Sequence, residues 1–322
     1  MTDTGPLFVS SGDLIADRRY KWALDEAARG DFAAAADVLA QTVELVPGFA
    51  TAWFALGAIR DRLGDRAGAV AAFAKAGDAD PEDYHGARLQ LARLGGGDDA
   101  PGMTETYVRR LFDQYAGRYD TALTEHLAYR GPAILRAAVE TAARHRARPL
   151  RFEAMLDLGC GTGLGGTAFR PLAERMVGVD LSPAMIAQAG AKRLYDRLVT
   201  ANIADFLAGE IAAGSRYQLV LAADVFVYVN DLKPILAAVA RLLTPDGLLA
   251  FTVETHAGSG IKLLPTLRFA FGEAYLRATI EQAGLTPLEL SAAAVRTEKG
   301  VPVDGLVVIA GFAEAGSPAD QA

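Results

Sequence analysis

LDLGCGTG, residues 156–163, is the stretch that decides the fold class of this chain. It follows an apolar run that starts near Leu150 and precedes an amphipathic helical segment. Glycines at 159, 161 and 163 let the backbone turn tightly and bring main-chain N–H groups close to a ligand, because no Cβ atom stands in the way. The stretch therefore predicts a ligand-binding loop between a buried strand and a helix.

The sequence after this loop alternates short apolar runs with helical segments. The runs at Met176–Val179, Tyr217–Ala222 and Leu248–Val253 are typical of buried strands, and we expect Gly305–Ala310 to close the sheet. Such alternation implies a mainly parallel sheet with helices on both faces. We predict an α/β, Rossmann-like, doubly wound domain over residues 103–313.

Two cofactors fit the glycine loop. Gly161, Gly163 and Gly166 satisfy the dinucleotide fingerprint, which makes an NAD-dependent oxidoreductase one interpretation. Asp157 ends the first strand, where it would repel a pyrophosphate but suits a cationic ligand such as S-adenosylmethionine. Asp180 lies about 20 residues beyond the loop, where a carboxylate can accept hydrogen bonds from both hydroxyls of a ribose. This combination favours S-adenosylmethionine.

Over Met103–Phe312 the chain resembles the class I S-adenosylmethionine-dependent methyltransferase superfamily. It is most similar to bacterial methyltransferases that carry tetratricopeptide repeats, and more distantly to ubiquinone and menaquinone methyltransferases. The resemblance implies that the glycines line the methionine part of the cofactor, Asp157 lies near its amine and Asp180 binds its ribose. The cofactor-binding residues it implies are Tyr115, Tyr119, Asp157, Gly159, Cys160, Gly161, Gly163, Asp180, Leu181, Met185, Asn202, Ile203 and Ala222.

Some of these positions carry a second interpretation. Related proteins usually have Asp where this chain has Asn202, whose amide oxygen can still accept from the adenine amino group while the next N–H donates. The segment Phe112–Asp120 resembles a lid over the cofactor, but its aromatic residues also fit a buried helix face. Cys160 is interpreted as a small loop residue rather than a nucleophile.

Methyl transfer needs no fixed catalytic motif, because the methyl sulfonium is already an activated electrophile and the protein mainly positions the acceptor. We select Asp224, Tyr228 and His256 as candidate catalytic residues, with Glu254 as a further candidate base. Asp224 also fits a helix cap, and His256 fits a surface loop. We expect 258–271 to supply the acceptor pocket; its segment 268–271 reads RFAF where related proteins have Arg-aromatic-Ala-His.

The N-terminal part repeats itself at an offset of 34 residues. Gly-Asp pairs at 30–31 and 64–65 are followed at equal spacing by Pro47 and Pro81. The second window also carries Trp53, Gly57 and Phe73 at the spacings of a tetratricopeptide repeat (TPR), and Tyr84–Leu94 fits a capping half repeat. Two unrelated helical hairpins are the alternative. We predict a small all-α TPR domain at 1–94, a linker at 95–102, the catalytic domain at 103–313 and a tail at 314–322.

Composition limits the setting in which the chain works. A net charge of −7 argues against a nucleic-acid substrate, although residues 144–151 form a local basic patch. No apolar run is long enough to span a membrane, and a single cysteine fits a cytoplasmic protein. The four histidines and the cysteine lack metal-ligand spacing, so we expect no metal.

We therefore predict a methyltransferase that acts on a small-molecule acceptor, with the TPR module binding a partner or mediating dimerisation. A methyltransferase acting on a protein recruited by the repeats is the main alternative. An NAD-dependent oxidoreductase and a non-catalytic TPR scaffold are further alternatives.

Overall fold

The structure is a computed structural model, and it describes residues 8–95, 100–121, 129–298 and 300–313. The chain divides into two compact units. The first comprises Met1–Leu111 with Lys262–Leu267, and the second comprises Phe112–Ile261 with Arg268–Ala322. The predicted tail, 314–322, and residues 96–99 of the predicted linker lie outside the described residues.

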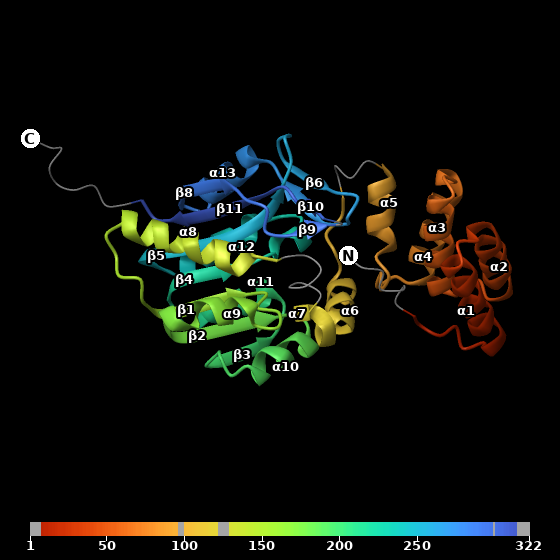
Figure 1. The fold of residues 1–322 in the computed structure, drawn as a ribbon, viewed down its shortest axis with the longest axis horizontal. Helices are drawn as coiled ribbons and strands as arrows, with labels where there is room; N and C mark the ends of the chain where they lie inside the picture. Colours follow the sequence, from red (N-terminus) through yellow and green to blue (C-terminus); the bar gives the residue numbers. More distant parts are fainter. Residues whose placement is uncertain (1–7, 96–99, 122–128, 299, 314–322) are drawn as a thin grey trace, which may run out of the picture. The chain divides into compact units, whose positions relative to one another are not determined.

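The first unit is built from consecutive helices that pack against their neighbours in chain order (Figure 1). Because the connections are short, successive helices run antiparallel as hairpins. A further helix, α6, crosses from the first unit into the second. These helices are α1 (Leu14–Ala28), α2 (Phe32–Leu45), α3 (Ala50–Arg62), α4 (Arg66–Ala79), α5 (Ala87–Gly95) and α6 (Glu105–Tyr115).

The 34-residue repetition of the sequence is also a repetition of local structure. Gly30 and Gly64 both have positive φ, +89° and +80°, which ends one helix and turns the chain toward the next. Asp31 and Asp65 then cap α2 and α4, each accepting a hydrogen bond of 2.9 Å from the backbone N–H three residues later. The Gly-Asp pairs therefore set the geometry of both hairpins.

The core of the first unit depends on small residues beside large ones. Tyr20, Leu39 and Leu56 are fully buried in one cluster. In the second hairpin, a Cβ atom added at Gly57 on α3 would lie 2.8 Å from the ring of Phe73 on α4. The helices approach this closely because position 57 has no side chain.

The second unit contains a sheet with strand order β3-β2-β1-β4-β5-β11-β8. The strands from β3 to β5 are parallel, whereas β11 is antiparallel to both β5 and β8. The predicted Rossmann-like, mainly parallel α/β fold is confirmed. The last predicted strand, β11, lies inside the sheet, and β8, which the sequence pattern did not reveal, forms its edge.

The strands of this unit are bounded as follows: β1 (Phe152–Leu158), β2 (Ala173–Asp180), β3 (Arg197–Thr200), β4 (Tyr217–Ala222), β5 (Leu243–Thr255), β6 (Ile261–Leu263), β7 (Phe269–Phe271), β8 (Thr286–Ala292), β9 (Thr297–Glu298), β10 (Val301–Pro302) and β11 (Gly305–Gly311). Strand β7 adds to β5 in parallel, and β9 and β10 form a short antiparallel pair.

Helices cover the sheet in two groups. Helix α8 packs against α9, β5 and β11, while α11, α12 and α13 pack against one another in chain order (Figure 1). The helices of this unit are α7 (Tyr119–Thr121), α8 (Gly131–His145), α9 (Leu164–Phe169), α10 (Pro183–Ala191), α11 (Ile203–Ala212), α12 (Lys233–Leu242) and α13 (Glu273–Gln282), with short 3-10 turns η1 (Ala116–Arg118), η3 (Arg170–Leu172) and η4 (Phe226–Tyr228).

Strand order reverses between β1 and β4, and this point positions the candidate site. The chain leaves β1 toward β2 and β3 on one side, and continues through β4 and β5 on the other. Loops that leave the carboxyl ends of neighbouring strands at such a switch point diverge and leave a crevice for a ligand. The glycine loop follows β1, Asp180 ends β2, and Asp224 follows β4.

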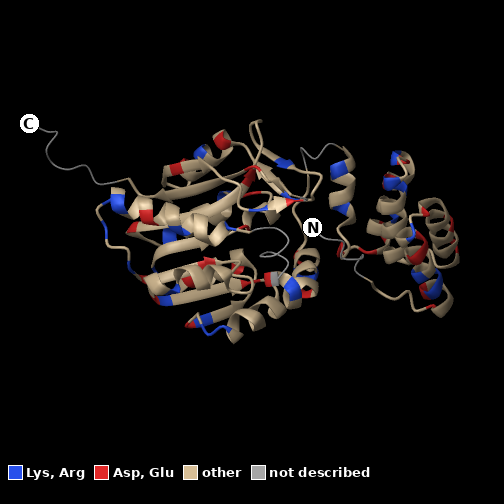
Figure 2. Cartoon of the chain, in the orientation of Figure 1, with Lys and Arg blue, Asp and Glu red and all other residues tan. Residues whose placement is uncertain are grey.

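Acidic and basic residues are dispersed over the helices and loops of both units (Figure 2). In the predicted basic patch, Arg148 forms an ion pair of 3.1 Å with Asp246, and Arg151 forms one of 2.9 Å with Glu174. The local positive charge is therefore partly offset by acidic neighbours. Within the described ranges, no helix is long and apolar enough to cross a membrane.

Two of the helical glycines in the second hairpin, Gly57 and Gly77, provide a matched test of its packing. Gly57→Ala should lower the free energy of unfolding by about 1–3 kcal/mol, because the new methyl group meets Phe73. Gly77→Ala, with open space around its Cβ, should raise it by about 0.5–1 kcal/mol. Both tryptophans of the chain lie in this unit, so urea denaturation followed by tryptophan fluorescence reports on it. Equal effects of the two substitutions would contradict the close helix crossing.

Candidate functional site

The glycine loop after β1 adopts a backbone that only glycine tolerates well. Gly159, Gly161 and Gly163 have φ values of +60°, +53° and +89°. A Cβ atom at Gly159 would lie 2.6 Å from Val225, whereas one at Gly161 would have, among the described residues, only Tyr119 nearby, at 4.0 Å. The loop therefore packs tightly on the β4 side and stays open around Gly161.

Asp180 fixes this loop from the end of β2. Its Oδ2 accepts from the Gly161 N–H at 2.9 Å, and its Oδ1 accepts from the Ser182 N–H at 2.9 Å. Burial raises the pKa of Asp180, and the two backbone donors act against this rise. One carboxylate thus connects the glycine loop to the start of α10.

Asp157 is a buried carboxylate that no cationic side chain of the described residues pairs with. It is 2% exposed, and Oδ2 accepts a hydrogen bond of 2.7 Å from the hydroxyl of Tyr195. Burial raises the pKa of Asp157 to about 7; the hydrogen bond from Tyr195 acts against this rise, and the nearby charge of Asp180 contributes to it. Burial therefore disfavours the ionised form of this carboxyl, and a cationic ligand nearby would stabilise that form.

The segment predicted as a lid, Phe112–Asp120, contacts both sides of the loop through carboxylates. Asp113 accepts from the hydroxyl of Ser182 at 2.5 Å. Asp120 accepts from the hydroxyl of Thr162 and forms an ion pair of 2.7 Å with Lys192. The segment therefore bridges the loop after β1 and the helix after β2.

The aromatic side chains of this segment lie beside the loop. Phe112 packs edge-on against Tyr119 and Tyr228, with ring centroids 6.1 and 5.1 Å apart. Tyr115 ends α6, and the guanidinium of Arg118 lies over its ring. The predicted site residues Tyr115 and Tyr119 thus both lie in this segment.

The other cofactor positions lie at the same ends of the strands. Met185 is fully buried on α10, and Ala222 ends β4. Asn202 caps α11, and its Oδ1 accepts from the Ala204 N–H at 2.7 Å. Leu181 follows Asp180 directly, and Ile203 is the first residue of α11. These residues thus lie at or shortly after the carboxyl ends of β2, β3 and β4.

Cys160 lies inside the glycine loop and is almost fully buried. Burial raises the pKa of its thiol well above the ordinary value, and the charges of Asp157 and Asp180 raise it further. A protonated thiol is a poor nucleophile. The geometry supports the interpretation of Cys160 as a loop residue.

Asp224, one of the candidate bases, belongs to a buried cluster of charges. Its backbone has φ +59°, and its carboxylate pairs with Arg268 at 3.2 Å and with Arg296 at 3.3 Å. Glu254 on β5 pairs with the same guanidinium groups, at 3.4 and 2.7 Å. Asp224 therefore serves as a partner in an ion cluster, and no helix cap is formed by its side chain within the described residues.

Tyr228 lies beside this cluster, with the guanidinium of Arg268 5.2 Å from its ring centre. Burial raises the pKa of Tyr228 to about 12, although the charge of Arg268 acts in the opposite direction. The phenol is therefore protonated at neutral pH. This state suits hydrogen-bond donation and ring packing rather than proton removal.

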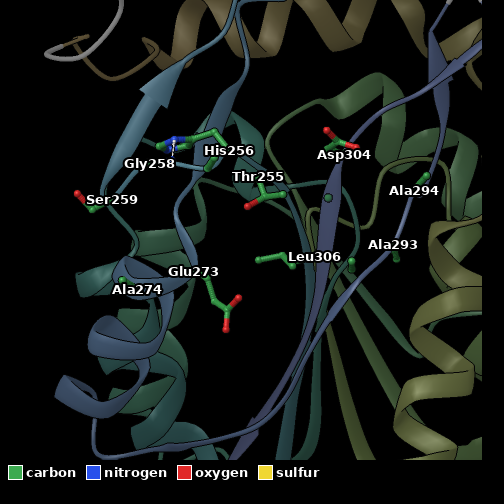
Figure 3. Close-up of a pocket in the computed structure, with 13 residues that line it drawn as sticks. Thr255, His256, Gly258, Ser259, Glu273, Ala274, Ala293, Ala294, Asp304 and Leu306 are labelled. Carbon is green, nitrogen blue, oxygen red and sulfur yellow. Dashed lines mark hydrogen bonds between the residues drawn. The ribbon is translucent and has the colours of Figure 1, made fainter.

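His256 follows β5 but is engaged with its own loop. Its Nδ1 accepts from the Gly258 N–H at 3.1 Å, so Nε2 carries the proton and donates to the Gly260 carbonyl at 3.2 Å. The ring lines a cavity of about 690 Å³ that Thr255, Glu273 and Asp304 also border (Figure 3). This geometry gives no support to His256 as the base.

Three contributors to the site escape the sequence pattern. Arg268 lies in the stretch predicted to form the acceptor pocket, but nothing marks it as an ion-pair partner of Asp224. Arg296 and Tyr195 lie in segments without any motif, and they meet Asp224 and Asp157 only through the fold. Their roles depend on contacts between residues far apart in the sequence.

Comparisons with known proteins fit this geometry. Residues 156–249 match the family model described as a methyltransferase domain. The ubiquinone biosynthesis O-methyltransferase of Azorhizobium caulinodans is 31% identical over 109 residues, which cover 32% of this chain and 40% of that protein. The malonyl-[acyl-carrier protein] O-methyltransferase of Methylovorus sp. is 31% identical over 164 residues, 48% of this chain and 52% of that protein. The chain thus spans about half or less of these relatives.

A solved structure shares the fold. The 1,6-didemethyltoxoflavin-N1-methyltransferase of Burkholderia thailandensis, solved with bound 1,6-didemethyltoxoflavin and S-adenosylhomocysteine, aligns with a TM-score of 0.50 and 22% identity over 66% of this chain and 92% of that chain.

The chain therefore contains a methyltransferase domain on a Rossmann-like α/β fold. S-adenosylmethionine is the cofactor with which this class of domain works, as predicted from the sequence. The predicted enzyme class is confirmed at the level of this domain, and the dinucleotide interpretation of the glycine fingerprint is not supported. The buried, cation-free Asp157 fits a positively charged cofactor.

Asp157 makes cofactor affinity depend on pH. Below a pKa of about 7 its carboxyl is protonated, so affinity for S-adenosylmethionine should rise with pH, by up to about ten-fold per unit below that pKa. The free energy of unfolding of the unliganded protein should fall as the pH rises toward 7. Over this range Asp157 keeps its proton in the folded state and loses it on unfolding. Calorimetric titrations between pH 5.5 and 8.5 test this.

Asp157→Asn is the matched control for that titration. The ionisation of the ligand is common to both proteins and cancels in the comparison. The variant should show a flatter affinity profile than the original protein. Parallel profiles would show that Asp157 does not carry the dependence.

Proposed function

We propose that this chain transfers the methyl group of S-adenosylmethionine to a small-molecule acceptor. The observation that carries the proposal is the glycine loop, held in a left-handed backbone between two buried carboxylates. Asp157 supplies negative charge at the end of β1, and Asp180 supplies it at the end of β2. This is the charge pattern that a cofactor with a cationic end and a ribose requires.

The cofactor roles are assigned by position. Asp157 binds near the methionine amine, and Gly159, Cys160, Gly161 and Gly163 line the methionine part. Asp180 binds the ribose: each of its oxygens accepts one backbone N–H and has a further lone pair for a hydroxyl. These assignments rest on the loop geometry.

The rest of the cofactor would lie against the next two strand ends. Asn202 and the N–H of Ile203 bind the adenine, since the amide oxygen that caps α11 can accept a second hydrogen bond. Leu181 and Met185 lie on the α10 side, and Ala222 on the β4 side. The segment Phe112–Asp120, which includes Tyr115 and Tyr119, excludes water from the glycine loop.

When bound, S-adenosylmethionine supplies a methyl group that is already activated by a positively charged sulfur. The residues of the chain then have to orient the acceptor and exclude water. Asp224 is held by two guanidinium groups and Tyr228 keeps its proton, so we assign both to shaping and polarising the acceptor pocket. This arrangement suits acceptors whose nucleophile needs little help in losing a proton.

We further propose that helices α1–α5 form a TPR module that binds a partner or a second copy of the chain. The support is the 34-residue repetition of turns and caps, together with the Gly57–Phe73 crossing. Two and a half such units form a short surface, sufficient for one helix or tail. A protein acceptor recruited by this module is the competing function.

Asp180 tests the cofactor assignment. Asp180→Ala should weaken S-adenosylmethionine binding by about ten-fold or more, because a charge-assisted contact and the tether of Gly161 are both lost. Asp180→Asn keeps the shape of the side chain and one acceptor oxygen. Its affinity for S-adenosylmethionine should lie between those of the original protein and Asp180→Ala. Asp37→Ala removes an exposed carboxylate from α2 and serves as the control. Unchanged calorimetric affinity in Asp180→Ala would refute the assignment.

A fragment that starts at Met103 separates catalysis from the helical module while keeping α6 and its Asp113 contact. We expect Met103–Ala322 to bind S-adenosylmethionine and to label low-mass compounds of a cell extract with a radioactive methyl group, as the full chain does. Only the full chain should self-associate or retain a partner in size-exclusion chromatography. Label that appears in a protein band, and only with the full chain, would establish the competing function.

A further inference from the structure

Two arginines are buried beside the proposed acceptor pocket, at the carboxyl ends of β4 and β5. The side chain of Arg296 is fully buried and that of Arg268 is 7% exposed. Both pair with Asp224 and Glu254, whose side chains are 5% and 2% exposed. These two arginines and two acids balance in charge, and the less buried Glu298 also pairs with Arg296. Burying the ion pairs together costs desolvation free energy, so the cluster is weak evidence for a contribution to stability.

The two guanidinium groups are engaged to different degrees. Arg296 spreads its contacts over Nη1 and Nη2, with short ion pairs of 2.7 Å to Glu254 and 2.9 Å to Glu298. Arg268 makes all its hydrogen bonds to described residues through Nη1, at 3.2 to 3.4 Å. The guanidinium of Arg296 is therefore fixed through both Nη atoms, whereas that of Arg268 is held only through Nη1.

Because Nη1 makes these contacts, the opposite edge of the Arg268 guanidinium has no protein partner among the described residues. The Nε atoms of Arg268 and Arg296 are both buried without a hydrogen-bond partner among the described residues, but only Arg268 also makes no hydrogen bond to these residues through Nη2. In a guanidinium, the Nε–H and one Nη2–H are parallel and match the two oxygens of a carboxylate. An unpartnered buried donor next to an anchored corner is the geometry of a recognition group rather than of a closed ion pair.

Aromatic side chains lie against this guanidinium group. The ring of Tyr228 lies against the guanidinium at 5.2 Å, and Phe112 packs on the same ring. Burial raises the pKa of Tyr228 and Tyr119, so their hydroxyls stay neutral donors. Val225, between Asp224 and Phe226, touches the Gly159 position of the cofactor loop. Arg268 thus borders the region where the acceptor would meet the methyl group.

We propose that Arg268 is the residue that selects the acceptor, by binding a carboxylate of an aromatic acid through its Nε and Nη2 edge. This proposal rests on the proposed methyltransferase function. The anchoring of Nη1 by Asp224 and Glu254 orients the free edge, and the aromatic rings provide a flat wall for the acceptor. The positive sulfur of the cofactor offsets the negative charge that such an acceptor brings.

The test compares two probes of the same shape, 4-hydroxybenzoate and its neutral amide 4-hydroxybenzamide. Each is titrated by calorimetry into the full chain saturated with S-adenosylhomocysteine. The carboxylate should bind at least about ten-fold more tightly than the amide, because a bidentate charged contact is replaced by a weaker one. Binding of S-adenosylhomocysteine is measured first in every protein.

Two variants separate recognition from folding. Arg268→Lys keeps the positive charge but removes the planar edge, and it should lose most of the preference for the carboxylate. Arg268→Gln combined with Glu254→Gln removes one charge of each sign, so the buried cluster stays balanced, and this variant should bind both probes equally. Both variants should retain S-adenosylhomocysteine affinity within about two-fold, which shows that the domain is folded.

The outcomes are distinguishable. A carboxylate preference that disappears in both variants supports the proposal. Equal binding of the two probes to the original protein, binding of neither, or a preference that survives in the variants would overturn it while leaving the methyltransferase function intact. Failure of the original protein to bind S-adenosylhomocysteine would instead refute the proposed function itself.

Discussion

The hydrogen bond from the Gly161 N–H to Asp180 is the contact on which the rest of the site depends. It joins the loop after β1 to the end of β2 across 19 residues, and it forms because Gly161 adopts a left-handed backbone. The same carboxylate accepts from Ser182, where α10 begins. Because the carboxylate is buried, its burial has to be offset by these donors, and that requirement holds the loop and the helix in one arrangement.

The buried acids at the carboxyl edge of the sheet have two kinds of partner. On the β1 and β2 side, Asp157 and Asp180 have only neutral donors among the described residues. On the β4 and β5 side, Asp224 and Glu254 are paired with guanidinium groups. The first side retains unbalanced negative charge and suits a cation, whereas the second is already balanced. The division between the proposed cofactor half and acceptor half therefore follows the strand order, because the chain reverses direction between β1 and β4.

The parts of this site that the sequence predicted are those encoded locally. The glycine loop and the helical hairpins with their Gly-Asp turns depend on residues a few positions apart, so spacing alone reveals them. Arg296 lies 72 residues from Asp224, and no local pattern links the two. The burial of Tyr228 and the loop hydrogen bonds of His256 likewise depend on the fold, so the sequence pattern that suggested both residues as candidate bases does not reveal them. The antiparallel strand β8 was missed because its residues alternate only weakly in burial.

The proposed charge arrangement also bears on what happens after transfer. Binding as proposed would bring the cationic sulfur of S-adenosylmethionine together with an anionic acceptor held by Arg268. When an ionised acceptor oxygen takes the methyl group, the sulfonium and the oxyanion are neutralised together, so no new charge has to be buried. The attraction between the two ligands disappears in the same step, while the balanced cluster of Asp224, Arg268 and their partners is unchanged. A pocket with this distribution of charge holds the substrates together more strongly than the products, and product release needs no further rearrangement of the buried ion pairs.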